Sequence, residues 1–442
     1  MVVLYLIFSV LIIIFLTARL NVHPFIALLL VALLYGFFAG MPAADIIASV
    51  NEGFGKTLGG IGLIIILGVI IGAFLENSGG AFAIAEKVLK IIGRDKVPSA
   101  MGIIGWLVSI PVFADSGFLL LSPLNKSLSK KAKISLAGTA IALGLGLTAS
   151  HTMVPPTPGP IAASGILGAD LGLVMAVGIP VSLIALAVGV TFAVKYVGKT
   201  YIDPNPSLSE EELQAKMQVA PGAFRSSLPV IIPILLIVLR STIIAVDGLG
   251  GFWVDFILFV GEPFIALLIG VFLALLLPKK LEKEMLSTSG WVGRSLTDAA
   301  SIILITGAGG IFGKVLQNSG IADVLGEALG GLNLSIWLPF LLAAAIKTAQ
   351  GSSTVALITT ASIMAPLMDT LGFSESLEKA MVVIAIGAGS AVVSHANDSF
   401  FWVLTQMSGM DTKMGYRMHT LGTLVLGTTA AITLFIAHLI FS

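Results

Sequence analysis

About ten long apolar segments follow one another along this chain, and they restrict its folding more than any other feature of the sequence. Each comes close to the ~20 apolar residues that an α-helix needs to cross a lipid bilayer. Charged residues make up 11% of the chain, against roughly 25% in soluble domains. The sequence therefore predicts an all-α polytopic membrane protein. The segments are residues 2–18, 24–40, 57–76, 134–150, 171–195, 226–246, 254–277, 295–316, 380–394 and 418–441.

Two further apolar stretches, 98–124 and 335–370, are interrupted near their middles by polar residues. The interruptions read "PVFADSG" (111–117) and "TAQGSST" (348–354). Each arm has about a dozen residues, which is too short to cross a bilayer and return but right for a re-entrant hairpin. We therefore expect each stretch to enter the membrane to mid-depth and leave on the same side.

The distribution of Lys and Arg predicts the orientation, because cytoplasmic loops are enriched in positive charge. With the N-terminus outside and both hairpins returning to the side they left, the outside loops keep only Lys56, Arg240 and Lys379. The hydrophilic linker 198–225 is then cytoplasmic, and an acidic first turn after Ser209 predicts one short helix within it. The first apolar segment lacks a basic n-region, so we expect a retained helix and not a signal peptide.

Two halves of the chain carry the same features in the same order. "GAFLENSGG" (72–80) matches "GKVLQNSGI" (313–321), a hairpin follows each, and a glycine-rich helix then ends in Ser150-His151 or Ser394-His395. Weak self-similarity among Gly- and Ser-rich membrane segments is the alternative, and the shared order argues against it. The ends of the first hairpin lie inside and those of the second outside, so we expect the repeats to be inverted.

Inverted repeats with broken helices are typical of secondary transporters, which bind substrate near the membrane midplane. The expected divisions are helices 1–56, a first repeat 57–197, the linker 198–225, helices 226–290 and a second repeat 295–442.

The interrupted helices leave backbone N–H and C=O groups without helical partners at membrane depth. N-terminal helix ends carry partial positive charge and suit a carboxylate, while small or hydroxylated residues let the backbone approach a ligand. The pattern favours a small, polar, anionic polyhydroxy solute; helix packing through small residues is the alternative. The candidate residues at the two tips are Ser116, Gly117, Gly351, Ser352, Ser353 and Thr354.

Ionisable residues at membrane depth are costly and are therefore candidates for function. The aspartates can take up and release protons, and Lys347 can neutralise a substrate carboxylate. The alternatives are that the acidic and histidine side chains cap broken helix ends, and that Lys347 pairs with an acidic residue. The four ionisable residues at the tips and breaks are Asp115, His151, His395 and Asp398.

Residues 154–160 read "VPPTPGP" and interrupt an apolar run. The prolines break the helix and remove backbone donors, so fewer N–H groups need partners there. Gly159 permits close backbone approach, and Thr157 carries the only hydroxyl of the stretch. We expect Pro156, Thr157, Pro158 and Gly159 to form one wall of the site.

Missing motifs exclude several classes of function. The chain has no cysteine, and it lacks the HExxH, GxSxG and GxxxxGKS/T motifs. The net charge is zero, which gives no reason to expect a nucleic acid. We therefore expect no enzyme activity, no cofactor, no metal and no ATP-driven step, and we expect coupling to an ion gradient.

Four motifs resemble the gluconate permease family of gluconate:proton symporters: "PVFADSGFLLLSPL", "HTMVPPTPGP", "GSSTVALITTASIMAPL" and "SHANDSFFW". They occur in collinear order over essentially the whole chain. The resemblance implies proton-coupled uptake of gluconate or a related sugar acid across a bacterial inner membrane, which makes the outside periplasmic. It also implies a homodimer in the lipid bilayer, in which a transport domain moves against a scaffold as in elevator-type transporters.

The family motifs carry over onto individual residues. The hairpin acid falls on Asp115, where gluconate-type members often have Glu, and the middle of PP-x-PGP falls on Thr157, where some members have His. These two departures leave D-serine, glycerate and other small hydroxy acids open as substrates. GS-x-T falls on Gly351, Ser352 and Thr354, SH-x-ND falls on Ser394, His395, Asn397 and Asp398, and the basic residue before the second tip is Lys347.

The sequence thus predicts a proton-coupled symporter for a small sugar acid. A sodium-coupled carboxylate transporter is the closest alternative, and an uncoupled channel or receptor is a further one. The expected substrate-binding residues are Asp115, Ser116, Gly117, His151, Pro156, Thr157, Pro158, Gly159, Lys347, Gly351, Ser352, Ser353, Thr354, Ser394 and Asn397. The expected proton-coupling residues are Asp115, Asp398 and His395.

Overall fold

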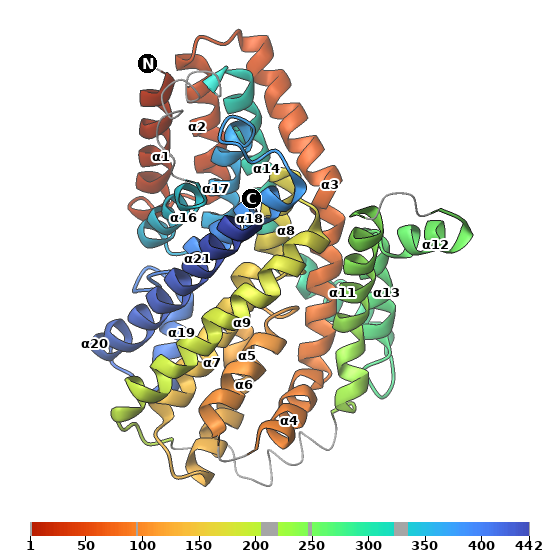
Figure 1. Cartoon of the computed structure of the whole chain (residues 1–442), viewed down its shortest axis with the longest axis vertical. Coiled ribbons are helices and arrows are strands. Elements are labelled where there is room, and N and C mark those ends of the chain that lie inside the picture. The colour runs from red at the N-terminus through yellow and green to blue at the C-terminus, as the bar shows by residue number, and fades with distance from the viewer. Residues whose placement is uncertain (1, 94–95, 205–219, 246–249, 322–334, 442) are drawn as a thin grey trace.

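The computed structural model describes residues 2–93, 96–204, 220–245, 250–321 and 335–441. Over these residues the chain is helical and contains no β-strand, which confirms the expected all-α class (Figure 1). Six described helical spans are long and apolar enough to cross a membrane, and a bent pair raises the number to seven. The six are Ala43–Asn77, Leu136–Leu167, Leu171–Lys199, Ala223–Ile244, Lys283–Asn318 and Thr412–Ile440.

Three of the other expected spans are short helices. α1 (Val2–Ala18), α2 (Pro24–Phe38) and α18 (Ser376–Ala391) have 17, 15 and 16 residues. At 1.5 Å per residue they are roughly 22–26 Å long, somewhat less than the ~30 Å thickness of a bilayer hydrocarbon core.

α3 (Ala43–Asn77) and α14 (Trp291–Asn318) form an antiparallel pair, and α3 runs along much of the molecule (Figure 1). Near one end of the pair, a Cβ on Gly53 would lie 2.5 Å from the carbonyl oxygen of Gly310. Near the other end, the rings of Phe74 and Trp291 meet edge-on with 5.2 Å between centroids. The two backbones therefore touch at the glycine crossing, which small residues permit.

The span expected at 57–76 is only the later part of α3, which already begins at Ala43. The division placed between residues 56 and 57 therefore falls inside a continuous helix. The polar residues just before position 57 are the reason why the sequence predicts a later start of this helix. Glu52 lies within the helix, where glutamate is favourable, and forms an ion pair with Lys314 of α14 at 2.9 Å.

Each expected hairpin is a pair of helices joined by a short turn. In the second pair, Gly351 turns the chain with a φ of 94°, a conformation that glycine adopts without a Cβ clash. In the first pair the turn lies at 109–113, earlier than expected. Asp115, Ser116 and Gly117 therefore lie in the first turn of a helix and not in the tip, and an acidic residue is favourable there because of the helix dipole. The helices are α5 (Val97–Val108), α6 (Ala114–Lys131), α16 (Trp337–Gln350) and α17 (Ser353–Met364).

Two helices are broken near the positions that the sequence indicated. α7 (Leu136–Met153) continues as α8 (Pro158–Leu167), and α18 continues as α19 (Ser399–Ser408). Pro158 occupies the first position of α8, where the missing N–H has no helical partner to lose. Asp398 caps α19, since its side chain accepts a hydrogen bond from the N–H of Phe400.

The span expected at 254–277 is not one helix. α12 (Phe252–Val260) and α13 (Pro263–Leu275) meet at an angle of 69°. Pro263 begins α13 and has no N–H to donate back into α12, so the helix is interrupted there. α11 (Ala223–Ala245) precedes this pair, and the short helix expected after Ser209 falls outside the described residues.

α7 is the most deeply placed helix, and it positions the functional site. All of its residues except His151, near its C-terminal end, are buried. The apolar part of the span Leu136–Leu167 is 94% buried. The remaining described α-helices are α4 (Gly80–Ile92), α9 (Leu171–Lys195), α20 (Thr412–Gly415) and α21 (Leu421–Phe441), the last two joined by a π-helical turn at Tyr416–Thr420.

Candidate functional site

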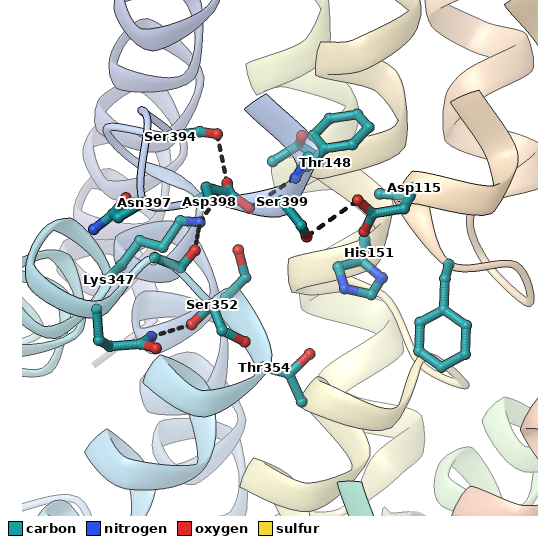
Figure 2. Close-up of a pocket in the computed structure, with 17 residues that line it drawn as sticks. Asp115, Thr148, His151, Lys347, Ser352, Thr354, Ser394, Asn397, Asp398 and Ser399 are labelled. Atoms are coloured by element: carbon teal, nitrogen blue, oxygen red, sulfur yellow. Dashed lines mark hydrogen bonds and ion pairs between the residues drawn. The ribbon is translucent and has the colours of Figure 1, made fainter. Parts of the chain in front are cut away.

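A cavity of about 310 Å³ lies where the two hairpins meet the two broken helices. Residues of α6, α7, α16, α17, α18 and α19 line it, so segments far apart in the sequence meet here. Figure 2 shows Lys347, Asn397 and Asp398 on one side and Asp115 and His151 on the other. The volume is near the lower end of the ~300–1,000 Å³ range of small-molecule sites, which suits a small solute.

Lys347 and Asp398 form a buried ion pair at the wall of this cavity. Lys347 Nζ lies 2.7 Å from Asp398 Oδ2, and the two side chains are 2% and 10% exposed. Nζ also donates to the carbonyl of Gly351, and Asp398 Oδ2 accepts a hydrogen bond from Ser394 Oγ. Among the described lining residues, Lys347 is the only lysine or arginine. The alternative that Lys347 pairs with an acidic residue is therefore realised in this structure.

Asp115 and His151 lie across the cavity from the ion pair (Figure 2). Asp115 Oδ1 accepts a hydrogen bond from Ser399 Oγ at 3.2 Å. The Nδ1 atom of His151 is buried and has no hydrogen-bond partner within the described part of the chain. A buried polar atom without a partner is costly. Because His151 lines the cavity, its ring is a candidate to bond a hydroxyl group of a bound molecule.

Three helix N-termini meet at the cavity, because the first residues of α6, α17 and α19 all line it. Such ends carry partial positive charge and N–H groups without helical partners. Asp115 lies in the first turn of α6, and Asp398 caps α19 by accepting from Phe400 N at 3.1 Å. α17 is capped by the neutral Ser352, whose hydroxyl accepts from Val355 N at 3.3 Å. The N-terminus of α17 therefore has no carboxylate cap of its own and suits an anion.

The second hairpin and the second helix break hold each other in place. Asn397 Nδ2 donates to the carbonyls of Thr348 at 2.9 Å and Ala349 at 3.1 Å, and His395 Nε2 lies 2.8 Å from the Thr348 carbonyl. These carbonyls belong to the C-terminal end of α16, where helical partners are missing. A Cβ on Gly351 would lie 2.1 Å from the Asn397 carbonyl oxygen, so glycine alone fits this contact.

The "VPPTPGP" stretch lies behind the cavity and does not line it. Thr157 is buried, and its hydroxyl donates to the Val154 carbonyl at 2.7 Å. A Cβ on Gly159 would lie 2.6 Å from Leu357 of α17 and 3.8 Å from the Cα of Thr354, a cavity residue. The expected site residues outside the lining are Ser116, Gly117, Pro156, Thr157, Pro158, Gly159 and His395.

Most of the charged and hydroxylated residues that the sequence singled out do meet at the cavity. The expected residues that line it are Asp115, His151, Lys347, Gly351, Ser352, Ser353, Thr354, Ser394, Asn397 and Asp398. The lining residues that the sequence reasoning missed are Phe113, Ala114, Thr148, Gln350, Ala391, Ser399 and Phe400. Most of these are chain neighbours of expected residues, and Thr148 lies one helical turn before His151.

His419 adds a buried contact that no sequence pattern revealed. It lies in the π-helical turn Tyr416–Thr420, and its Nε2 is 3.0 Å from Ser394 Oγ. Thr423 Oγ1 accepts from Ser394 N at 3.1 Å. A chain of bonds therefore leads from His419 through Ser394 to Asp398 and Lys347. A π-helical turn shifts the helical register, so apolar periodicity gives no sign of where such a side chain points.

A bundle of apolar spans with a charged cavity between broken helices defines a class of membrane transport protein. A family model described as GntP family permease matches residues 1–440. The chain belongs to this family, and it is a multi-pass permease of the inner membrane and not an enzyme.

Several curated relatives match over nearly the whole chain. A gluconate permease of Pseudomonas aeruginosa is 34% identical over 96% of this chain and 95% of that protein. An "uncharacterized permease" of Haemophilus influenzae is 34% identical over 99% and 92%. The low-affinity gluconate transporter of Escherichia coli K12 is 32% identical over 98% and 97%.

The fold also matches that of a solved transporter. The crystal structure of the YdaH transporter of Alcanivorax borkumensis aligns with a TM-score of 0.69 over 95% of this chain and 98% of that one. The two sequences are 12% identical, so this likeness concerns the fold alone.

Proposed function

We propose that this chain is a proton-coupled symporter that imports gluconate, or a closely related small sugar acid, across the inner membrane. The substrate class rests on relatives named as gluconate permeases or transporters and on a cavity of suitable size and polarity. The observation that carries the proposal is the Lys347–Asp398 ion pair, in which Nζ and Oδ2 lie 2.7 Å apart. The lysine in this pair is suited to bind a substrate carboxylate once the acid is neutralised.

The charges of the cavity favour the binding of an anion together with a cation. Its lining holds one lysine, Lys347, and two carboxylates, Asp115 and Asp398, so its charge is negative when all three are ionised. An anionic substrate would add to this excess in surroundings of low dielectric constant, where like charges repel strongly. A proton on either aspartate offsets that repulsion. Substrate and proton therefore favour each other's binding.

Protonation of Asp398 supplies the exchange step in this proposal. A proton on Oδ2 neutralises the partner of Lys347, whose ammonium then forms a charge-assisted hydrogen bond with the substrate carboxylate. His151 Nδ1 and the hydroxyls of Ser353 and Thr354 bind the hydroxyl groups of the substrate. On the side with fewer protons Asp398 loses its proton, pairs with Lys347 again and so displaces the substrate.

For the movement, we infer two inverted repeats that shift as an elevator. The antiparallel packing of α3 and α14 supports the inversion, because equivalent helices of inverted repeats run in opposite directions. Both helices end at the asparagine of an Asn-Ser-Gly motif, α3 at Asn77 and α14 at Asn318. Each is followed in the chain by a hairpin and then a broken helix.

The transport domain then consists of the two repeats, 57–197 and 295–442. The scaffold of the homodimer consists of residues 1–56 and 226–290. α3 crosses the first division and so links the two domains. The distribution of Lys and Arg supports a periplasmic N-terminus and a cytoplasmic linker at 198–225.

A sodium-coupled carboxylate transporter is the second candidate, and the same cavity charges favour it. A sodium ion would offset the negative charge of Asp115 and Asp398 as a proton does, and their oxygen atoms with the Gly351 carbonyl are ligands of the kind that hard cations take. D-serine and glycerate remain the alternative substrates.

Thermal-shift measurements test the substrate class, because a ligand that binds only the folded state raises the apparent stability, by about 2.7 kcal/mol at 100 times its Kd. We expect gluconate to raise the Tm of the purified protein more than glycerate or D-serine does at equal concentration. Lys347→Gln should reduce the shift strongly. Lys379→Gln, which changes a lysine outside the cavity, should retain it. A shift with D-serine and none with gluconate would overturn the proposed substrate.

A further inference from the structure

A second cavity, of about 210 Å³, lies between α3 and α14. Its polar lining comprises Glu52, Lys56 and Thr57 of α3 with Lys314 and Gln317 of α14. The end of α8 and the turn that follows α17 complete its walls. The two cavities share no lining residue among those described. We refer to it as the α3–α14 cavity.

α17 connects this cavity with the main one. Its first residue, Ser353, lines the main cavity, and Ala365 and Pro366, which follow its last turn, line the α3–α14 cavity. The twelve residues of α17 give a separation of about 18 Å at 1.5 Å per residue. α8 packs beside α17 and ends at the same place, where Gly165 and Ile166 face the α3–α14 cavity.

The lysines give the α3–α14 cavity an excess of positive charge. Lys314 Nζ lies 2.9 Å from Glu52 Oε1 and 3.3 Å from Gln317 Oε1. Lys56 is exposed and makes no ion pair with any residue that the structure describes. The cavity therefore holds two lysines against one carboxylate. The Lys314 and Glu52 side chains are 22% and 52% exposed, so neither end of this ion pair is fully buried.

We propose that the α3–α14 cavity is a second binding site for the small organic carboxylate that the chain transports. The inference rests on the proposed function, because it takes the same anion as its ligand. Lys56 attracts the carboxylate, and the bound anion competes with Glu52 for Lys314. Lys56 lies inside α3 and not in a loop, so the anion binds within the bundle, about one length of α17 from the main cavity. Positive charge in a cleft raises the local concentration of an anionic substrate.

Uptake kinetics of two charge variants test this site in the full-length protein in proteoliposomes. Lys56→Gln removes the unpaired cation, and we expect the KM for gluconate to rise about two- to fivefold, as for exposed charge interactions. Glu52→Gln removes the competing carboxylate and frees Lys314, so we expect KM to fall. Both differences should disappear in roughly 1 M salt, where the Debye length is ~3 Å.

Lys379→Gln is the matched control, because it also removes a lysine, but one that lines neither described cavity. Its KM should stay at the wild-type value. Opposite shifts for Lys56→Gln and Glu52→Gln support the site, and unchanged or parallel KM values in a transporting protein overturn it. A wild-type protein that transports no sugar acid overturns the proposed function and this inference together.

Discussion

Lys347 Nζ and Asp398 Oδ2 lie 2.7 Å apart, in side chains that are 2% and 10% exposed. The pair joins α16 of the second hairpin to the cap of α19, so it connects the hairpin with the helix break. Removing one partner of a buried pair leaves an uncompensated charge, at a cost of about 3–5 kcal/mol. A ligand that binds Lys347 therefore has to bring a negative charge of its own, and Asp398 has to be neutralised by a proton.

Lys347→Gln should weaken gluconate binding roughly 10- to 150-fold, because a hydrogen bond to a charged group contributes about 1.5–3 kcal/mol. Isothermal titration calorimetry measures this loss directly. Lys347→Arg keeps the charge and should retain part of the affinity. Full affinity in Lys347→Gln would show that this lysine does not hold the substrate carboxylate.

Asp398→Asn should separate exchange from accumulation, because asparagine resembles the protonated acid and cannot lose a proton. We expect preloaded proteoliposomes to exchange gluconate with the outside but not to accumulate it under a pH gradient. Asp115→Asn is the matched comparison, since Asp115 faces the same cavity from α6 and bonds to Ser399. Accumulation by Asp398→Asn together with its loss in Asp115→Asn would assign the proton to Asp115 instead.

His419→Phe should change the position of Asp398 without emptying the space that the imidazole fills. The rings of Phe400 and Phe401 lie 5.5 and 6.2 Å from the His419 ring, measured between centroids, and phenylalanine keeps that packing. The lost bond to Ser394 contributes about 1 kcal/mol, so we expect about a fivefold rise in KM and a shifted pH profile of uptake. His419→Gln, which can still bond to Ser394, should restore both in part. Equal effects in the two variants would rule out the bond as the cause.

Gly351→Ala should destabilise the protein more than Gly372→Ala does. Both glycines have positive φ values, 94° and 82°, so both substitutions carry the cost of about 1–2 kcal/mol of a left-handed conformation. A Cβ at Gly351 also meets the Asn397 carbonyl, whereas nothing lies within 4 Å of one at Gly372. Thermal melting should therefore show the lower Tm for Gly351→Ala, with loss of uptake. Identical melting curves would mean that the hairpin and the break do not depend on this contact.

The breaks in the helices could be predicted because the residues that cause them, such as proline, act on the backbone locally. Proline removes a donor wherever it stands, so the break before Pro158 follows from chemistry alone. Pro263 carries the same signal inside a long apolar run, so the sequence predicts one span at 254–277 where the structure has α12 and α13. Asp115 was expected in a tip, but its helix begins directly after the turn.

The neighbours of a side chain could not be predicted, because they depend on tertiary packing. The sequence predicts that Thr157 faces the substrate, but its hydroxyl donates to the Val154 carbonyl at 2.7 Å and it does not line the cavity. The partner of Lys347 stayed open because the sequence separates it from Asp398 by 51 residues. His419 faces Ser394 from a π-helical turn, which leaves no trace in the apolar pattern.

Uptake of radiolabelled gluconate into proteoliposomes under an imposed pH gradient tests the central claim most directly. We predict accumulation above the external concentration when the outside is more acidic than the inside. A protonophore should abolish it, and replacing sodium with potassium should leave it unchanged. Accumulation that requires a sodium gradient and ignores the pH gradient would contradict proton coupling, and equilibration without accumulation would contradict symport.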